Sequence, residues 1–129
     1  MSLASEIGAY LEAQNIGAVG TDVFLTLLPD TPDTVVAIIP YPGLPPEDTF
    51  QTPNVWIYPR FQVLVRNRDY VPAYAKTLAI FQVLNFGESV LSGIHYMRCR
   101  PLQSEALIDS DANGRIILRM NYEAWKEVS

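Results

Sequence analysis

The strongest constraint on the fold lies in the last third of the chain, where two segments alternate between apolar and polar residues. Residues 93–102 and 115–125 both follow the two-residue period of a β-strand. Between them, residues 111–114 (Asp-Ala-Asn-Gly) favour a tight turn, since glycine readily adopts positive φ. The pattern predicts a long antiparallel pair. One side of the first strand carries Ile94, Tyr96, Arg98 and Arg100, and the other His95, Met97 and Cys99; the second strand directs Ile116, Leu118, Met120, Tyr122 and Ala124 to one face.

The rest of the chain predicts two helices and three further strands. Residues 2–15 form a helix that Ser2 caps and Gly17 ends, and a second helix runs from a cap at Asp69 to about Phe86. Strands are expected at 22–28, 34–41 and 60–67, the first two as a hairpin or as neighbours. The apolar stripes of the helices are Leu3, Ile7, Tyr10, Leu11 and Gln14, then Tyr70, Ala73, Tyr74, Thr77, Leu78, Phe81 and Leu84.

These elements predict an α+β fold in the order α-β-β-β-α-β-β, with two helices packed on a mostly antiparallel sheet of about five strands. At 129 residues, the chain suits one domain covering 1–129. Residues 42–55 are rich in proline and acid and are expected to form a long loop. Phe50 in this loop is a candidate anchor for a neighbouring chain, or it packs on its own domain.

Composition narrows the classes of function. A net charge of −5 disfavours tight binding to nucleic acid or to an anionic membrane. Cys99 is the only cysteine, so no internal disulfide can form. The N-terminal residues have neither the basic region nor the apolar run of a signal peptide, and no segment has the roughly 20 apolar residues of a membrane span. We therefore expect a protein made in a cytoplasm that has no membrane partner.

Two patterns invite a search for reactive chemistry. Residues 109–116 match the first half of a calcium-binding loop, but Met120 occupies the position of the bidentate glutamate, so turn chemistry explains Asp109, Asp111 and Asn113 better. His95 and Cys99 lie four residues apart on one strand, too far for a direct hydrogen bond. We therefore expect no catalytic residues, no metal site and no cofactor.

Arginine pairs on two predicted strands are the best candidates for a binding surface. Arg66 and Arg68 lie on one face of a strand, and Arg98 and Arg100 on one face of another. Arginine is enriched at protein interfaces because its planar fork pairs with carboxylates in two places. With Phe50, these four arginines are the predicted oligomer interface. A solvated sheet face explains them equally well, and a nucleic-acid surface is disfavoured because no exposed aromatic residues are interleaved.

The segment from Pro59 to Leu84 resembles a family of phage minor capsid and tail-terminator proteins. Its members share a strand ending in Q-[VI]-x-V-R, followed by a Tyr and an Ala that open a helix. Upstream strands ending in Leu-Leu-Pro and Ile-Pro-Tyr, and a closing hairpin with D-x-x-G-R, also fit. The family positions are occupied here by Gln62, Val63, Val65, Arg66, Tyr70, Ala73 and Leu84.

The resemblance implies a virion protein assembled in the host bacterial cytoplasm. It implies a homo-oligomeric ring, a hexamer, that ends tail-tube growth and presents the tail to the head-completion or connector protein. The tail-tube protein is a second implied partner, and DNA passes through the ring without specific binding. The family has no enzymatic activity and no cofactor.

Other functions remain open on the sequence. The chain could be another connector or tail component, such as a stopper or tube protein, which its location in the particle would reveal. It could also be a small-ligand-binding α+β protein, with His95, Tyr96 and Arg98 as the best candidates for the site, or an unrelated adaptor.

Overall fold

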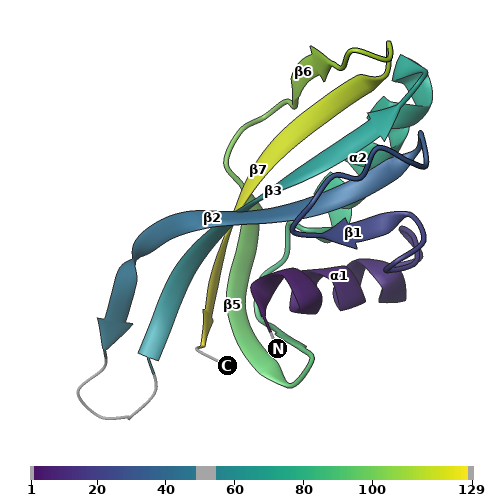
Figure 1. The fold of residues 1–129 in the computed structure, drawn as a ribbon. Coiled ribbons are helices and arrows are strands. Elements are labelled where there is room, and N and C mark those ends of the chain that lie inside the picture. Colours follow the sequence, from purple (N-terminus) through teal and green to yellow (C-terminus); the bar gives the residue numbers. More distant parts are fainter. Residues whose placement is uncertain (1, 49–54, 128–129) are drawn as a thin grey trace.

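The computed structural model describes residues 2–48 and 55–127, which form one curled β-sheet with both helices on the same side of it (Figure 1). The predicted α+β class is confirmed, with 7 strands in place of about five. In chain order the elements are α1 (Leu3–Ala13), β1 (Val23–Leu25), β2 (Val35–Asp48), β3 (Val55–Asn67), α2 (Tyr70–Val83), β4 (Ser89–Leu91), β5 (Ile94–Pro101), β6 (Leu107–Ser110) and β7 (Ile116–Glu127).

The centre of the sheet is the antiparallel pair of β3 and β7. The strands run in the order β1-β2-β3-β7-β5-β4, and β6 also pairs with β7. Apolar alternation correctly predicted the inward faces of both central strands, since Phe61, Val63, Val65, Leu118 and Met120 are all buried. The first two strands are neighbours and not a hairpin, because β1 runs parallel to β2.

Most of the expected loop at 42–55 is β-structure, so that prediction was wrong. Strand β2 continues to Asp48 and pairs with β3, and the two strands form an arm that extends beyond the rest of the sheet (Figure 1). The prolines are tolerated because β1 pairs with β2 only up to Ile38, which leaves the outer edge of the later part of β2 without a need for N–H donors. Register shifts after Tyr41 and after Leu44 accommodate the irregular backbone. Phe50 lies outside the described residues.

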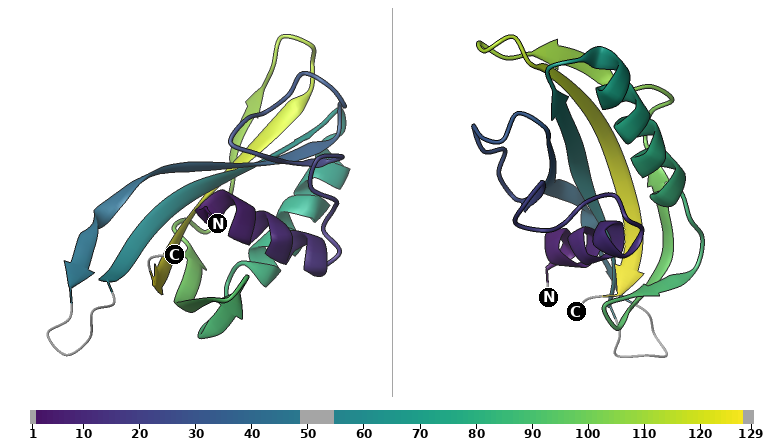
Figure 2. Two further views of the ribbon diagram at one scale, coloured as in Figure 1. Left: turned by 60° about the horizontal axis from the view of Figure 1, so that its bottom comes forward. Right: turned by 90° about the vertical axis from the view of Figure 1, so that its right-hand side faces the viewer.

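Both helices pack on one face of the sheet, and two views show them on the same side (Figure 2). Ser2 caps α1 as predicted, accepting a hydrogen bond from the Ser5 amide at 3.2 Å. The stop at Gly17 was wrong, because α1 ends at Ala13 and Asn15 takes the positive φ of 62°. None of the helices in the described parts of the chain has the length and hydropathy needed to cross a bilayer.

The apolar stripe predicted for α2 was only half right. The helix buries Ala73, Thr77 and Ile80, whereas Tyr70, Tyr74 and Leu78 from the same predicted stripe remain exposed. The helix ends at Val83, before the predicted Phe86. Because α2 is apolar over a wider arc than the sheet covers, spacing alone could not select the face that packs.

Strand β5 departs from strict alternation. A register shift between Tyr96 and Arg98 brings Tyr96 and Cys99 to the same buried side, against the prediction that placed Tyr96 with the arginines. A bulge inserts one residue and so reverses the side on which later residues lie. Arg98 and Arg100 therefore lie on the outer face, away from the helices.

Candidate functional site

The reactive side chains named in the sequence are engaged within the fold. The His95 Nε2 atom lies 2.9 Å from Glu88 Oε1. Cys99 is fully buried, and this burial raises the pKa of its thiol to about 12, which disfavours a thiolate nucleophile. Tyr96 points into the core, so it does not converge with His95 and Arg98 on a ligand site. Across residues 2–48 and 55–127, no three His, Cys, Asp or Glu side chains gather as metal ligands would.

The carboxylate of Asp111 organises the turn between β6 and β7. Its Oδ1 accepts hydrogen bonds from the amides of Asn113 and Arg115, each at 3.0 Å, and its Oδ2 accepts from Arg115 Nε at 2.7 Å. Gly114 completes the turn with φ of 75°. The acidic run that resembles a calcium loop therefore serves the hairpin.

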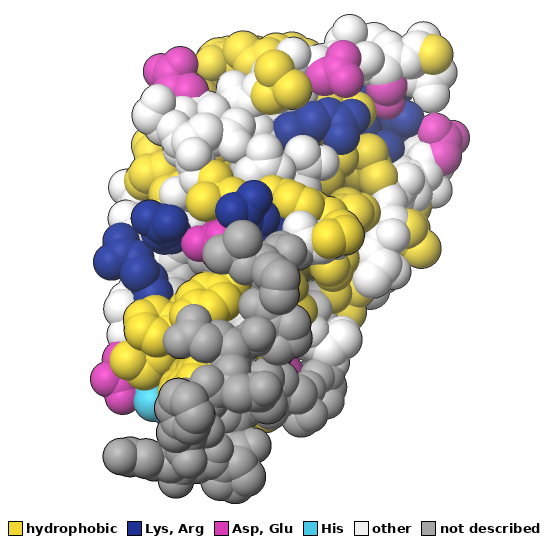
Figure 3. Space-filling view, turned by 90° about the vertical axis from the view of Figure 1, so that its left-hand side faces the viewer, with side chains coloured by type: hydrophobic (Ala, Val, Ile, Leu, Met, Phe, Trp, Pro, Cys, Tyr) yellow, Lys and Arg dark blue, Asp and Glu magenta, His cyan; other side chains and the backbone are white. Residues whose placement is uncertain are grey.

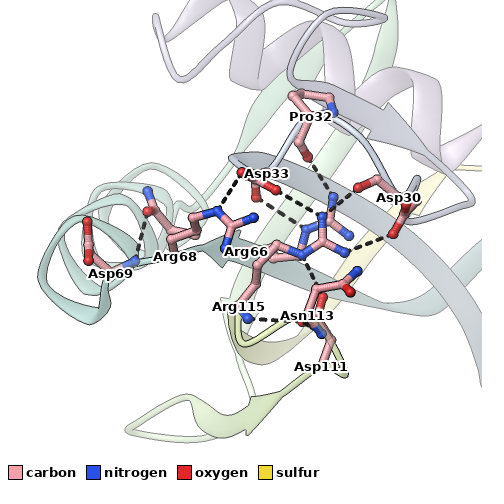
Figure 4. Close-up of polar contacts among 10 residues, drawn as sticks. Asp30, Pro32, Asp33, Arg66, Arg68, Asp69, Asp111, Asn113 and Arg115 are labelled. Carbon is pink, nitrogen blue, oxygen red and sulfur yellow. Dashed lines mark hydrogen bonds and ion pairs between the residues drawn. The ribbon is translucent and has the colours of Figure 1, made fainter.

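Two buried arginines, Arg66 and Arg115, hold the loop at residues 30–33 against one end of the outer sheet face, and we call these contacts the latch (Figure 4). Arg66 donates to the carbonyl oxygens of Pro32 and Asp33, at 2.6 and 3.2 Å. Arg115 pairs with Asp30 at 3.0 Å and with Asp33 at 3.2 Å. Beneath the same loop, Leu28 packs against a small cluster of Ala37, Leu64 and Ile117. Arg66 thus acts within its own chain, and Arg68 is exposed but pairs with Asp33 at 2.7 Å.

This latch is expected to weaken in acid. The amide of Arg115 and then its side chain lower the pKa of Asp111, and a hydrogen bond from Arg68 lowers the pKa of Asp33. A lowered pKa means that the stabilisation is present above the ordinary value of about 4 and is lost as pH falls through the lowered pKa. The melting temperature of Asp111→Asn should therefore lie below that of the wild type near neutral pH, and the gap should close below about pH 3.

Thermal unfolding between about pH 3 and pH 7, followed by circular dichroism, checks this expectation. Asp69→Asn is the matched control, because the Asp69 side chain makes no capping hydrogen bond on α2. A gap between Asp111→Asn and the wild type that stays constant with pH would contradict the latch.

Aromatic rings form a continuous row on the outer face near the base of the arm. The ring centroids of Trp56 and Trp125 are 5.9 Å apart, and those of Tyr58 and Trp125 are 5.8 Å apart. His95 extends the row, with its ring 5.8 Å from Trp56. The aromatic row is the set Trp56, Tyr58, Trp125 and His95. On an outer sheet face, such a row indicates a surface for contact with another molecule.

Three arginines lie beside the aromatic row, and two of them share one carboxylate. Glu123 pairs with Arg60 at 3.0 Å and with Arg100 at 3.3 Å. Arg98 is exposed and makes no hydrogen bond or ion pair with the described residues. A hollow of about 160 Å³ lies between these groups, lined by Tyr58, Arg98, Arg100, Glu123, Ala124 and Trp125, and we call it the cationic pocket. Figure 3 shows Lys and Arg side chains gathered beside hydrophobic ones on this face.

A buried ion pair joins the two ends of the chain and was not foreseen from the sequence. Lys126 Nζ lies 2.5 Å from Glu6 Oε1, and Tyr96 donates to the same oxygen at 2.6 Å. All three side chains are buried. The one available signal was Lys126, which continues the inward alternation of β7 at a position where an apolar residue is expected.

Comparisons with known proteins agree on one class. A family model described as "Bacteriophage tail terminator protein" matches residues 10–128. No curated protein matches the sequence. A chain from the structure titled "Virion of native gene transfer agent (GTA) particle" is similar in fold, with a TM-score of 0.68 and 18% sequence identity. The alignment covers 98% of this chain and 96% of that one.

Proposed function

The chain belongs to the bacteriophage tail terminator protein family, and on that premise we propose that it forms a homo-oligomeric ring that ends tail-tube growth and presents the tail to the head connector. It is a structural protein of the virion tail. The observation that carries the proposal is the family match, which extends over residues 10–128. The ring is proposed to be a hexamer of one-domain subunits that contact the tail-tube protein on one side and a head-completion protein on the other.

The outer sheet face supports a function in assembly. The aromatic row and the cationic pocket give this face the aromatic and arginine side chains that are enriched at protein interfaces. Of the arginines predicted to lie at the interface, Arg98 and Arg100 are exposed on this face. We propose that they contact a neighbouring subunit. Arg68 stays a candidate beside the latch, and Phe50 stays a candidate on the sequence alone.

The charge of the chain suits a ring through which DNA passes. A net charge of −5 gives the subunit little attraction for phosphates, so few contacts would have to break as DNA moves. We further propose that the protein acts through its surfaces and without catalysis. In the described part of the chain, the histidine, His95, pairs with Glu88, and the cysteine, Cys99, is buried with a raised pKa, so neither offers a nucleophile.

Tail length provides the direct test. Particles assembled without this protein are expected to contain tubes longer than those of mature virions, because nothing ends polymerisation. Adding the purified protein to growing tubes should stop growth, and electron microscopy should place it at one end of each tube. Tubes of normal length that fail to join heads would instead indicate a connector component, and tubes of normal length on intact particles would contradict the proposal.

A further inference from the structure

Two exposed surfaces stand out in the described part of the chain, and the first is the cationic pocket. Arg60, Arg98 and Arg100 surround the single carboxylate of Glu123, so positive charge is in excess there. Glu88 and Glu127, the acids at the far end of the aromatic row, lie beside His95. Trp125 forms one wall of the pocket and keeps 37% of its surface exposed. The pocket is therefore shaped for an acidic group next to an apolar one.

The second surface lies between α2 and β6. Tyr74, Leu78 and Phe81 line a hollow of about 160 Å³ that Glu105 and Ala106 close on the other side. We call it the tyrosine stripe, and its exposed apolar side chains are Tyr70, Tyr74, Leu78 and Ile108. Apolar side chains gathered so closely on a surface indicate a contact site.

The charges beside the tyrosine stripe are negative. Asp69 stands at the start of α2, and its side chain makes no capping hydrogen bond. Glu105 is exposed on the opposite rim, and its carboxylate has no ion pair with any described residue. Arg68, which precedes Asp69 in the chain, is already paired with Asp33. This surface therefore offers two unpaired carboxylates around an aromatic centre, which is the complement of the cationic pocket.

The two surfaces lie on opposite sides of the sheet. Arg98, Arg100 and Trp125 alternate with Cys99 and Ala124, which belong to the helix-side core, so the cationic pocket faces away from the helices. The tyrosine stripe is on the helix side, where α2 covers the sheet (Figure 2). Complementary patches on opposite sides of one subunit generate a head-to-tail contact, which closes into a ring when the rotation permits.

We propose that the cationic pocket of one subunit receives the tyrosine stripe of the next copy of this chain. The inference rests on the proposed ring and specifies its contact. A second copy is the occupant because the chain itself carries the matching acids and aromatic rings. A contact of pocket with pocket would bring arginines of two subunits together, and like charges at an interface are strongly unfavourable.

Charge reversal on each surface tests the pairing. The first variant is Arg98→Glu with Arg100→Glu, and the second is Asp69→Lys with Glu105→Lys; all four side chains are exposed. Each variant alone brings like charges together and should weaken assembly at least about tenfold. An equimolar mixture restores opposite charges at every contact of an alternating ring with an even number of subunits, so assembly should return.

Assembly is measured by analytical ultracentrifugation at low salt, with tail tubes that lack a terminator as seeds, and circular dichroism confirms that each variant is folded. Acrylamide quenching of tryptophan fluorescence gives a second readout, since Trp125 should become shielded on assembly. Recovery in the mixture supports the pairing. Rings from either variant alone, or no recovery in the mixture, would overturn the pairing and leave the ring itself standing. A wild-type chain that forms no ring even on tubes would overturn both proposals.

Discussion

Replacing Lys126 by methionine is expected to lower the free energy of unfolding by about 3–5 kcal/mol, because it leaves the Glu6 carboxylate buried without a counter-charge. Glu6 is 0% exposed and Lys126 is 2% exposed, so water cannot take the place of the ammonium group. The remaining partner of the carboxylate would be the Tyr96 hydroxyl. Methionine keeps most of the volume of the lysine stem, so the change isolates the charge.

The double variant Lys126→Met with Glu6→Gln separates charge from packing. Without either charge, most of the lost stability should return, since a neutral pair avoids the desolvation of an unpaired ion. Urea unfolding of the wild type, Lys126→Met, Glu6→Gln and the double variant gives the coupling free energy. Lys76→Met is the matched control. The ammonium group of Lys76 donates a hydrogen bond to the Ile16 carbonyl at a partly buried position. Losing this bond should lower the free energy of unfolding by about 1 kcal/mol. A Lys126→Met variant as stable as Lys76→Met would contradict the buried pair.

The same pair shows where sequence reasoning ends. Glu6 and Lys126 are 120 residues apart, and only Lys126 stands at a position where the period of its element predicts an apolar side chain. Alternation could place Lys126 on the inward face of β7 but could not supply its partner, because partner choice is a property of the tertiary fold. By contrast, the inward faces of β3 and β7 were predictable, since both strands keep one register along their shared length.

Local irregularity explains the other differences. The bulge in β5 reverses the side of Tyr96 relative to Arg98, and no residue type at that point announces a bulge. Proline in β2 is read as a loop signal because it cannot donate to a sheet ladder, yet it costs little on an open strand edge. Arg66 was read as a surface group from its position after alternating residues, but the loop at Pro32 and Asp33 folds over it.

The candidate surfaces were predictable to a smaller extent. Arg98 and Arg100 were named from the sequence as interface residues, and they are exposed at the cationic pocket. The aromatic row was missed because Trp56, Tyr58 and Trp125 come from strands that become neighbours only in the sheet. The tyrosine stripe was read as core, since helical spacing cannot distinguish a face that packs on its own sheet from a face that awaits another subunit.

Two aromatic residues on opposite faces of the sheet are expected to fail in different ways when each is replaced by alanine. Phe61 is 0% exposed, and its ring stacks on Tyr122 with centroids 5.4 Å apart. Removing it opens a cavity at the centre of the core, so Phe61→Ala should lower the free energy of unfolding by about 3–5 kcal/mol. Denaturant unfolding followed by circular dichroism measures this loss.

Trp125→Ala is the counterpart on the outer face and should leave the fold largely intact. Its ring is partly exposed and, among the aromatic side chains that the structure describes, touches only Trp56 and Tyr58, so the loss of folding free energy should stay below about 2 kcal/mol. Assembly on tail tubes should nevertheless be lost, since the ring of Trp125 forms a wall of the cationic pocket. If Trp125→Ala assembled normally, or if it unfolded as readily as Phe61→Ala, the outer face would serve the stability of the subunit and not its contacts. A folded Trp125→Ala subunit that fails to assemble separates folding, which the core between helices and sheet supports, from assembly, in which the outer face takes part.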